Sequence, residues 1–261
     1  MIPISDENPT LRTPVMTLAI LAVTWMSWIF VQDGLSVFLV TSHPSGEGLA
    51  FSICNWGLVP GELTFRAPLG LAVPMGGQWV CAVDHESRNW LTPVTSMFLH
   101  GSWGHIAGNS LYLWVFGNNI EDSMGRWRFL GFYLVTGVAA GLTHILIDPA
   151  SPVPTVGASG AISGVMGAYL VLYPRVRVRT YFPPIFLFRL PAWAILILWF
   201  GMQVLTGLPQ LMTMNPEISG GVAVWAHVGG FVAGLLLIRS FHDPDLLRRR
   251  KVGGDAKVVW Q

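Results

Sequence analysis

The sequence predicts an all-α membrane protein with six transmembrane helices, and three observations lead to this fold class. Apolar residues make up 52% of the 261 residues and charged residues only 11%, whereas soluble domains carry about 25% charged residues. Six apolar stretches are each long enough to cross a bilayer core of about 30 Å, which takes about 20 helical residues. The basic residues gather on one side of these stretches. A net charge of +1 gives no reason to expect a nucleic-acid partner.

The elements follow in chain order from their composition. Polar residues 1–13 are expected to form an N-terminal tail. Residues 41–91 are expected to form a long loop outside the membrane, because Pro68 and Pro74 interrupt its apolar part. Residues 240–261 form a basic tail, suited to contact with anionic lipid. The spans between them are helical, since a backbone in lipid must pair within its own segment. In the 14–239 core these spans are 14–40, 92–115, 129–147, 157–173, 190–207 and 221–239.

The distribution of basic residues sets the expected orientation. With six spans and a cytoplasmic N-terminus, 13 of the 15 Lys and Arg fall on the cytoplasmic side, and Arg66 and Arg88 are the other two. This asymmetry follows the positive-inside rule. Both termini are therefore expected in the cytoplasm, with the short tails suggesting a bacterial inner membrane. Cys54 and Cys81 lie in the outside loop, where they could form a disulfide or remain two unrelated thiols.

Four polar residues lie at a similar depth in the outer half of the predicted bundle. His105 and Asn109 are four apart in the second span, Ser159 opens the fourth, and His227 lies near the start of the sixth. A serine hydroxyl needs a base to act as a nucleophile, and histidine is the natural one. With no acidic residue at this depth, a Ser159–His227 dyad is expected. His105, Asn109 and the backbone N–H of Ser159 are candidate donors to an oxyanion.

Small residues line the fourth and sixth spans at helical spacing. Gly157, Gly160 and Gly164 lie on the fourth span, and Gly230 and Gly234 form a GxxxG on the sixth. Such rows let helix backbones approach closely. The polar residues beside these glycines could therefore serve only the packing of the helices. The same close packing would also bring a nucleophile and its base together.

Two other kinds of chemistry use the same side chains. A zinc site could be drawn from His100, His105, His144 and His227, but the sequence has no His-Glu-x-x-His helix and no carboxylate beside them. A transporter would show inverted repeats and paired broken helices, and no internal symmetry is visible. No metal or other cofactor is therefore expected.

The motifs resemble those of the rhomboid intramembrane serine proteases. The strings GASGAISGVMGAYLVLYP (157–174) and AHVGGFVAG (226–234), with the His-x-x-x-Asn of His105 and Asn109, carry the resemblance. It implies a six-helix core, Ser159 as nucleophile and His227 as base. It also implies an oxyanion hole of His105, Asn109 and the Ser159 amide, and transmembrane protein substrates in the lipid bilayer. The alternative within this resemblance is a non-proteolytic rhomboid-like protein that binds and escorts membrane clients.

The resemblance also bears on the fifth span and on how the base is held. It implies that this span and residues 208–220 gate the lateral entry of substrate. Some members of the family place a tyrosine four residues after the nucleophile, stacked on the catalytic histidine. This chain has Ser163 there, so His227 must be held in another way. The sequence does not indicate an oligomeric state.

Overall fold

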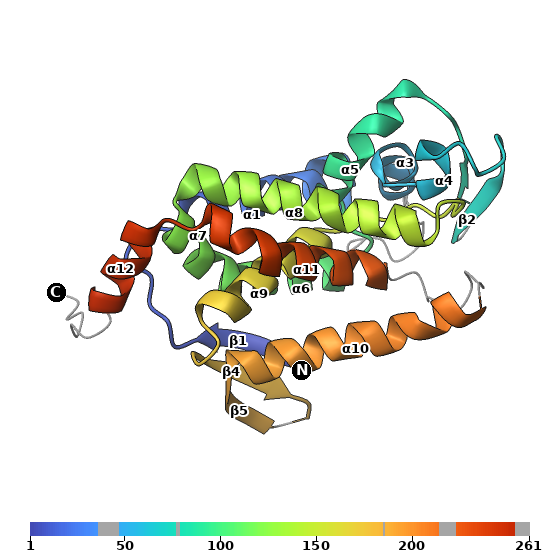
Figure 1. Cartoon of the computed structure of the whole chain (residues 1–261). Coiled ribbons are helices and arrows are strands. Elements are labelled where there is room, and N and C mark those ends of the chain that lie inside the picture. The colour runs from blue at the N-terminus through green and yellow to red at the C-terminus, as the bar shows by residue number, and fades with distance from the viewer. Residues whose placement is uncertain (36–46, 77–78, 185, 214–222, 254–261) are drawn as a thin grey trace.

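Helices running side by side make up most of the molecule, as the computed structural model shows for residues 1–35, 47–76, 79–184, 186–213 and 223–253 (Figure 1). We call the end that carries residues 47–91 the loop end and the opposite end, which carries the C-terminal helix α12, the tail end. The long helices are α1 (Val15–Met26), α6 (Trp103–Tyr112), α7 (Asn118–Met124), α8 (Arg126–Ile147), α9 (Ser159–Leu172), α10 (Ala192–Thr213) and α11 (Val224–Phe241). Single π-helical turns, η1 (Ser27–Val31) and η4 (Leu113–Gly117), extend α1 and join α6 to α7.

Helix α9 lies at the centre of the bundle. Every residue from Gly160 to Tyr169 is buried, as expected for a helix that is apolar or small on all faces. It contacts α8, α10, α11 and η4. The central position of α9 places its first residue, Ser159, inside the loop end of the protein.

Within the described residues, three helices are long and apolar enough to cross a bilayer: Arg126–Ile147, Ala192–Pro209 and Val224–Phe241. Val15–Val31 and Ser159–Leu172 are apolar but shorter. The mostly helical fold with apolar spans is therefore confirmed, and the count of six spans stays a prediction. Parts of the first and last predicted spans, 36–40 and 221–222, lie outside the described residues.

The predicted boundaries of the second span are wrong. Residues 92–98 form two short turns, α5 (Thr92–Thr95) and η3 (Ser96–Phe98), and Leu99 is extended. The long helix begins only at Trp103, where the Ser102 hydroxyl accepts the His105 N–H and caps its N-terminus, and it continues to Met124. Apolar composition alone does not distinguish the turns from the helix.

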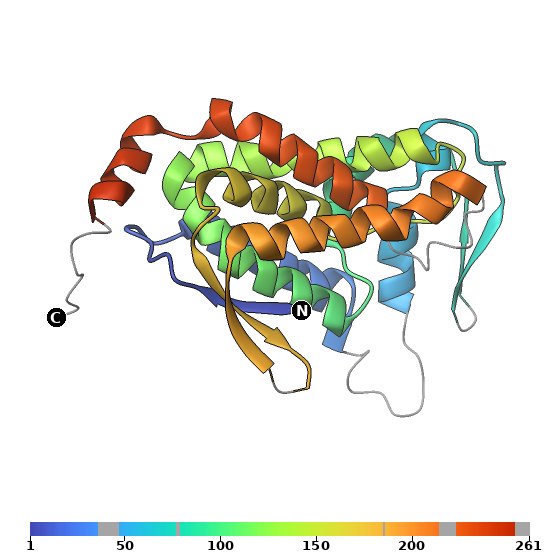
Figure 2. The ribbon, with the colours of Figure 1, turned by 60° about the horizontal axis from the view of Figure 1, so that its bottom comes forward.

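The all-α prediction is also wrong outside the spans. Strands β1 (Ile2–Asp6), β4 (Arg177–Phe182) and β5 (Phe186–Pro191) form an antiparallel sheet in the order β1-β4-β5. Residues 2–6 of the expected N-terminal tail are thus a strand. Figures 1 and 2 show the β4–β5 hairpin projecting from the bundle beside the start of α10.

The long loop is structured where it is described. It contains the helices α3 (Glu47–Trp56) and α4 (Pro60–Leu63), the hairpin of β2 (Ala72–Gly76) and β3 (Trp79–Ala82), and the turn η2 (Ser87–Leu91). A disulfide between Cys54 and Cys81 joins α3 to β3, which decides between the two alternatives left open by the sequence. Leu58 pairs with Thr155, so the loop is tied to the segment that leads into α9.

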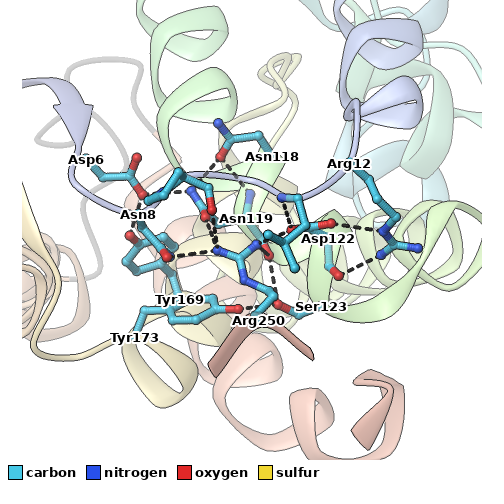
Figure 3. A network of polar contacts seen from close by, with 12 residues as sticks. Asp6, Asn8, Arg12, Asn118, Asn119, Asp122, Ser123, Tyr169, Tyr173 and Arg250 are labelled. Carbon is cyan, nitrogen blue, oxygen red and sulfur yellow. Dashed lines mark hydrogen bonds and ion pairs between the residues drawn. The ribbon is translucent and has the colours of Figure 1, made fainter. Parts of the chain in front are cut away.

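A buried polar network holds the tail end together (Figure 3). Arg250 of α12 (Pro244–Gly253) donates to Asp122 at 2.7 Å, to Asn119 at 2.5 Å and to Asn8 at 2.8 Å. It is 8% exposed, although the basic tail was expected to face lipid. Beside this network, Glu121 accepts the backbone N–H groups of Met16 and Thr17. The carboxylate thereby caps the first turn of α1.

Candidate active site

Ser159 and His227 meet at the loop end of the bundle. The Oγ of Ser159, the first residue of α9, lies 2.7 Å from Nε2 of His227, in the first turn of α11. This is hydrogen-bond distance between a hydroxyl and a potential base. The two residues are 68 positions apart in the chain, and helix packing alone brings them together.

Glycines on facing helices make this approach possible. A Cβ on Gly230 would overlap the carbonyl oxygen of Gly160, and one on Gly234 would overlap that of Gly164. On its other side, Gly164 faces the side chain of Thr136 on α8, which leaves no room for a Cβ. The backbones of α9 and α11 are therefore in contact just below Ser159 and His227.

Two residues of α10 contact the His227 ring. Oε1 of Gln203 lies 3.0 Å from Nδ1 of His227, and the Trp199 ring centroid lies 5.9 Å from the His227 ring. Ser163 donates its hydroxyl to the Ser159 carbonyl at 2.6 Å, within its own helix. The sequence analysis missed Gln203 and Trp199. The signal available for Gln203 was an amide side chain in an otherwise apolar span, where polar groups are costly.

The His105 ring is oriented from its own helix start. Its Nδ1 accepts the Gly101 N–H at 3.3 Å, so the ring hydrogen of the neutral tautomer is on Nε2. That nitrogen faces Gly157, where a Cβ would lie 2.7 Å from Nε2 and 3.5 Å from the Ser159 Oγ. Gly157 has a φ of +129°, a conformation that favours glycine. Gly157 therefore lets the chain pass between the two side chains.

Asn109 offers a further donor at the same place. Its Nδ2 is buried and has no hydrogen-bond partner within the described part of the chain. Asn109 lines a cavity of about 540 Å³ together with Ser159, His227, His105 and Gln203. A buried donor without a partner is costly, and an oxygen atom in the cavity would satisfy it.

His100 and His144 are the other two histidines that the zinc alternative would use. His100 is fully buried, with its ring edge-on to that of His105 at 4.9 Å. His144 lies at the loop end of α8 and contacts the Thr155 hydroxyl at 3.2 Å through Nε2. Among the described residues, no group of three or more His, Cys, Asp or Glu side chains is arranged to hold a metal ion.

Comparison with known proteins gives one family. The family model of the rhomboid domain matches residues 87–243. Rhomboid-like protein 11, chloroplastic, of Arabidopsis thaliana is 39% identical over 80 residues, which are 31% of this chain and 28% of that protein. Rhomboid protease GluP of Bacillus subtilis is 40% identical over 81 residues, which are 31% of this chain and 15% of GluP.

A longer match covers more of the chain. The mitochondrial Presenilin-associated rhomboid-like protein of Mus musculus is 28% identical over 156 residues, 57% of this chain and 37% of that protein. The chain thus spans less than half the length of each of these relatives. The matched part of the family model, 87–243, contains the four residues Ser159, His227, His105 and Asn109.

Proposed function

The chain belongs to the rhomboid family, and we propose that it is a serine endopeptidase that hydrolyses peptide bonds in or near transmembrane segments of other membrane proteins. The observation that carries the proposal is the 2.7 Å contact between the Ser159 hydroxyl and the His227 ring. The glycine contacts between α9 and α11 support it, because they fix this distance through the backbone rather than through mobile side chains.

The proposed reaction uses the two residues in turn. Ser159 Oγ attacks the scissile carbonyl carbon while His227 Nε2 takes the hydroxyl proton. The tetrahedral intermediate collapses, its C–N bond breaks, and the leaving nitrogen takes the proton from His227. This leaves an acyl ester on Ser159. Water then attacks the ester with His227 again as the base, which releases the new carboxyl terminus and restores the serine.

The oxyanion of this reaction would form in the cavity among three donors. His105 offers Nε2–H, Asn109 offers Nδ2–H, and Ser159 offers its backbone N–H at the start of α9. Donors that are already oriented stabilise a developing charge without reorganisation. A helical substrate must unwind locally to present its carbonyl here, because that carbonyl is otherwise bonded within the helix. Segments with small or helix-weak residues would meet this requirement best.

The proposed orientation puts the site on the outer face of the membrane. The residues Arg12, Arg128 and Arg248 lie with the other basic side chains of the tail end, and the positive-inside rule puts that end in the cytoplasm. The disulfide of Cys54 and Cys81 at the loop end is in keeping with an oxidising outer compartment. Some relatives are named as chloroplastic or mitochondrial, so the membrane of this protein need not be a bacterial inner membrane.

The test is cleavage of a single-span model substrate by the purified protein in detergent. Ser159→Ala and His227→Ala should each abolish hydrolysis, whereas Ser163→Ala should retain it, because that hydroxyl bonds to its own helix. A fluorophosphonate probe should label the wild type but not Ser159→Ala. Full hydrolysis by Ser159→Ala would exclude the proposal. Client binding without cleavage or labelling would favour an escort protein, and loss of activity on chelation would favour zinc.

A further inference from the structure

We propose that Gln203 is a positioning residue that holds the catalytic base, His227, in its active tautomer and orientation. Through this contact, catalysis depends on the position of α10. The inference rests on the proposed function, since it assigns a role beside the Ser159–His227 pair. It starts from the contact of 3.0 Å between Gln203 Oε1 and His227 Nδ1. This contact engages the ring nitrogen that does not face the nucleophile.

The tautomer of His227 decides whether it can act as a base. Nε2 faces the Ser159 hydroxyl and must be unprotonated to take its proton, so the ring hydrogen has to be on Nδ1. The amide oxygen of Gln203 accepts that hydrogen and cannot accept from any other tautomer. Turned the other way, the amide would donate to Nδ1 and leave the hydrogen on Nε2, where it would block the reaction.

A neutral amide suits this position better than an acid would. In soluble serine proteases a buried aspartate holds the histidine in its tautomer and orientation. A carboxylate at this depth in a membrane protein would carry a large desolvation cost. The Gln203 amide supplies the same acceptor atom without adding a charge. Gln203 therefore orients the His227 ring, while the polar groups of the cavity stabilise the positive charge of the imidazolium.

Helix α10 supplies both contacts to the His227 ring. Trp199 and Gln203 are four residues apart, so they project from the same face of α10. Ser163, which stands where some rhomboids have a tyrosine, bonds within α9 instead. The base of this protein is thus oriented from α10 rather than from the helix that carries the nucleophile.

The two halves of α10 pack differently. At the tail end, Ala192, Ile195 and Leu196 are buried in the core. Both halves expose large apolar side chains, such as Ile197 at 50% and Leu205 at 62%, but the half that carries Gln203 rests on α11 through Gly207 and Trp225. The orientation of His227 consequently depends on α10 lying against α11. Displacement of this half would remove the acceptor from Nδ1 while Ser159 and His227 stay in contact through the glycine seam.

The test compares two substitutions of the same side chain in the whole 261-residue chain. Gln203→Met keeps the length and removes the acceptor, and Gln203→Glu keeps an acceptor oxygen at the same place. We expect Gln203→Met to lower kcat about 10- to 100-fold, the range seen when a partner that orients a metal-ligating histidine is removed, with KM unchanged. Gln203→Glu should keep kcat above that of Gln203→Met because an acceptor oxygen remains, although the desolvation cost of the acid should lower its thermal stability. Thr206→Val, one turn away on an exposed part of α10, is the control and should match the wild type.

A spectroscopic measurement separates positioning from packing. In protein labelled with ¹⁵N-histidine, the hydrogen-bonded Nδ1–H signal of His227 should be present in the wild type and in Gln203→Glu, and lost in Gln203→Met. Wild-type kcat and an unchanged Nδ1–H signal in Gln203→Met would overturn the inference. The proposed function fails separately, if Ser159→Ala hydrolyses the substrate as fast as the wild type. An equal loss of kcat in both Gln203 variants would also overturn the inference.

Discussion

Gly234 on α11 lies directly against the carbonyl oxygen of Gly164 on α9, with no space for a Cβ between them. One turn nearer the loop end, Gly230 lies in the same way against Gly160. Contacts between backbones cannot relax by a change of rotamer. The separation of α9 and α11, and with it the distance from Ser159 to His227, is therefore set by residues that take no part in chemistry.

Gly230→Val is expected to lower stability and activity together. The added side chain would overlap the Gly160 carbonyl and force the helices apart, at a cost of about 1–3 kcal/mol for overpacking. The measurements are thermal unfolding in detergent and cleavage of the model substrate. Gly201→Ala on α10 is the control, because a Cβ there meets nothing within 4 Å. Wild-type stability and activity in Gly230→Val would contradict the close-packing argument.

Asn109→Ala is expected to impair catalysis without abolishing it. Removing one oxyanion donor costs roughly 10²–10³ in kcat in a well-studied soluble protease, and His105 and the Ser159 amide would remain. Thermal stability should hardly change, because the Asn109 amide nitrogen has no partner within the described residues. Asn55→Ala is the control, since its exposed amide donates to the Phe51 carbonyl within α3. A kcat equal to that of the wild type would show that Asn109 is not part of the proposed oxyanion hole.

Arg250→Met is expected to destabilise the protein from the tail end. The substitution leaves Asp122 buried with Arg12 as its remaining ion-pair partner. Removing one partner of a buried ion pair costs about 3–5 kcal/mol, and we expect the lower end of this range because Arg12 remains. Arg248→Met, at a side chain that is 76% exposed, should cost less than about 1 kcal/mol. Similar unfolding temperatures for the two variants would show that the network does not stabilise the fold.

The sequence was sufficient to identify the polar residues of the candidate site that lie in apolar spans. Ser159, His227, His105 and Asn109 were identifiable because polar groups are rare in apolar spans, and the topology predicts a shared depth for them. Gln203 was equally visible as a polar residue in a span. Its role depends on how α10 is rotated and placed against α11, which the apolar pattern of α10 does not fix.

Other features depend on contacts between distant parts of the chain. Strand β1 pairs with β4 across more than 170 residues, and neither strand exceeds six residues, too short for a clear alternating pattern. The burial of Arg250 likewise depends on a distant contact. Its charge predicts on which side of the membrane it lies, but not that it is buried against Asp122. The composition of each segment could thus be read from the sequence, but which distant segments contact each other could not.

Glu62 introduces a pH dependence at the opposite end of the molecule. It lies in α4, in the long loop of residues 47–91, and is 5% exposed, with Oε1 accepting the Asp84 N–H at 3.0 Å. Burial raises its pKa from 4.5 to about 7, because removal from water disfavours the ionised carboxylate. The folded protein therefore holds a proton on Glu62 at pH values where the unfolded chain has released it.

This pKa shift sets the sign of the expected effect on stability. The contribution of the protonated Glu62 is fully present below about pH 4.5, decreases as the pH rises toward 7 and is lost above it. Thermal unfolding of the wild type should accordingly begin at lower temperature at pH 8 than at pH 5. Glu62→Gln keeps the side chain neutral at every pH, so its unfolding temperature should lose this component of the pH dependence. Glu47→Gln, at an exposed position in α3, should keep it. If Glu62→Gln and the wild type show the same change between pH 5 and pH 8, Glu62 is not buried as a neutral acid.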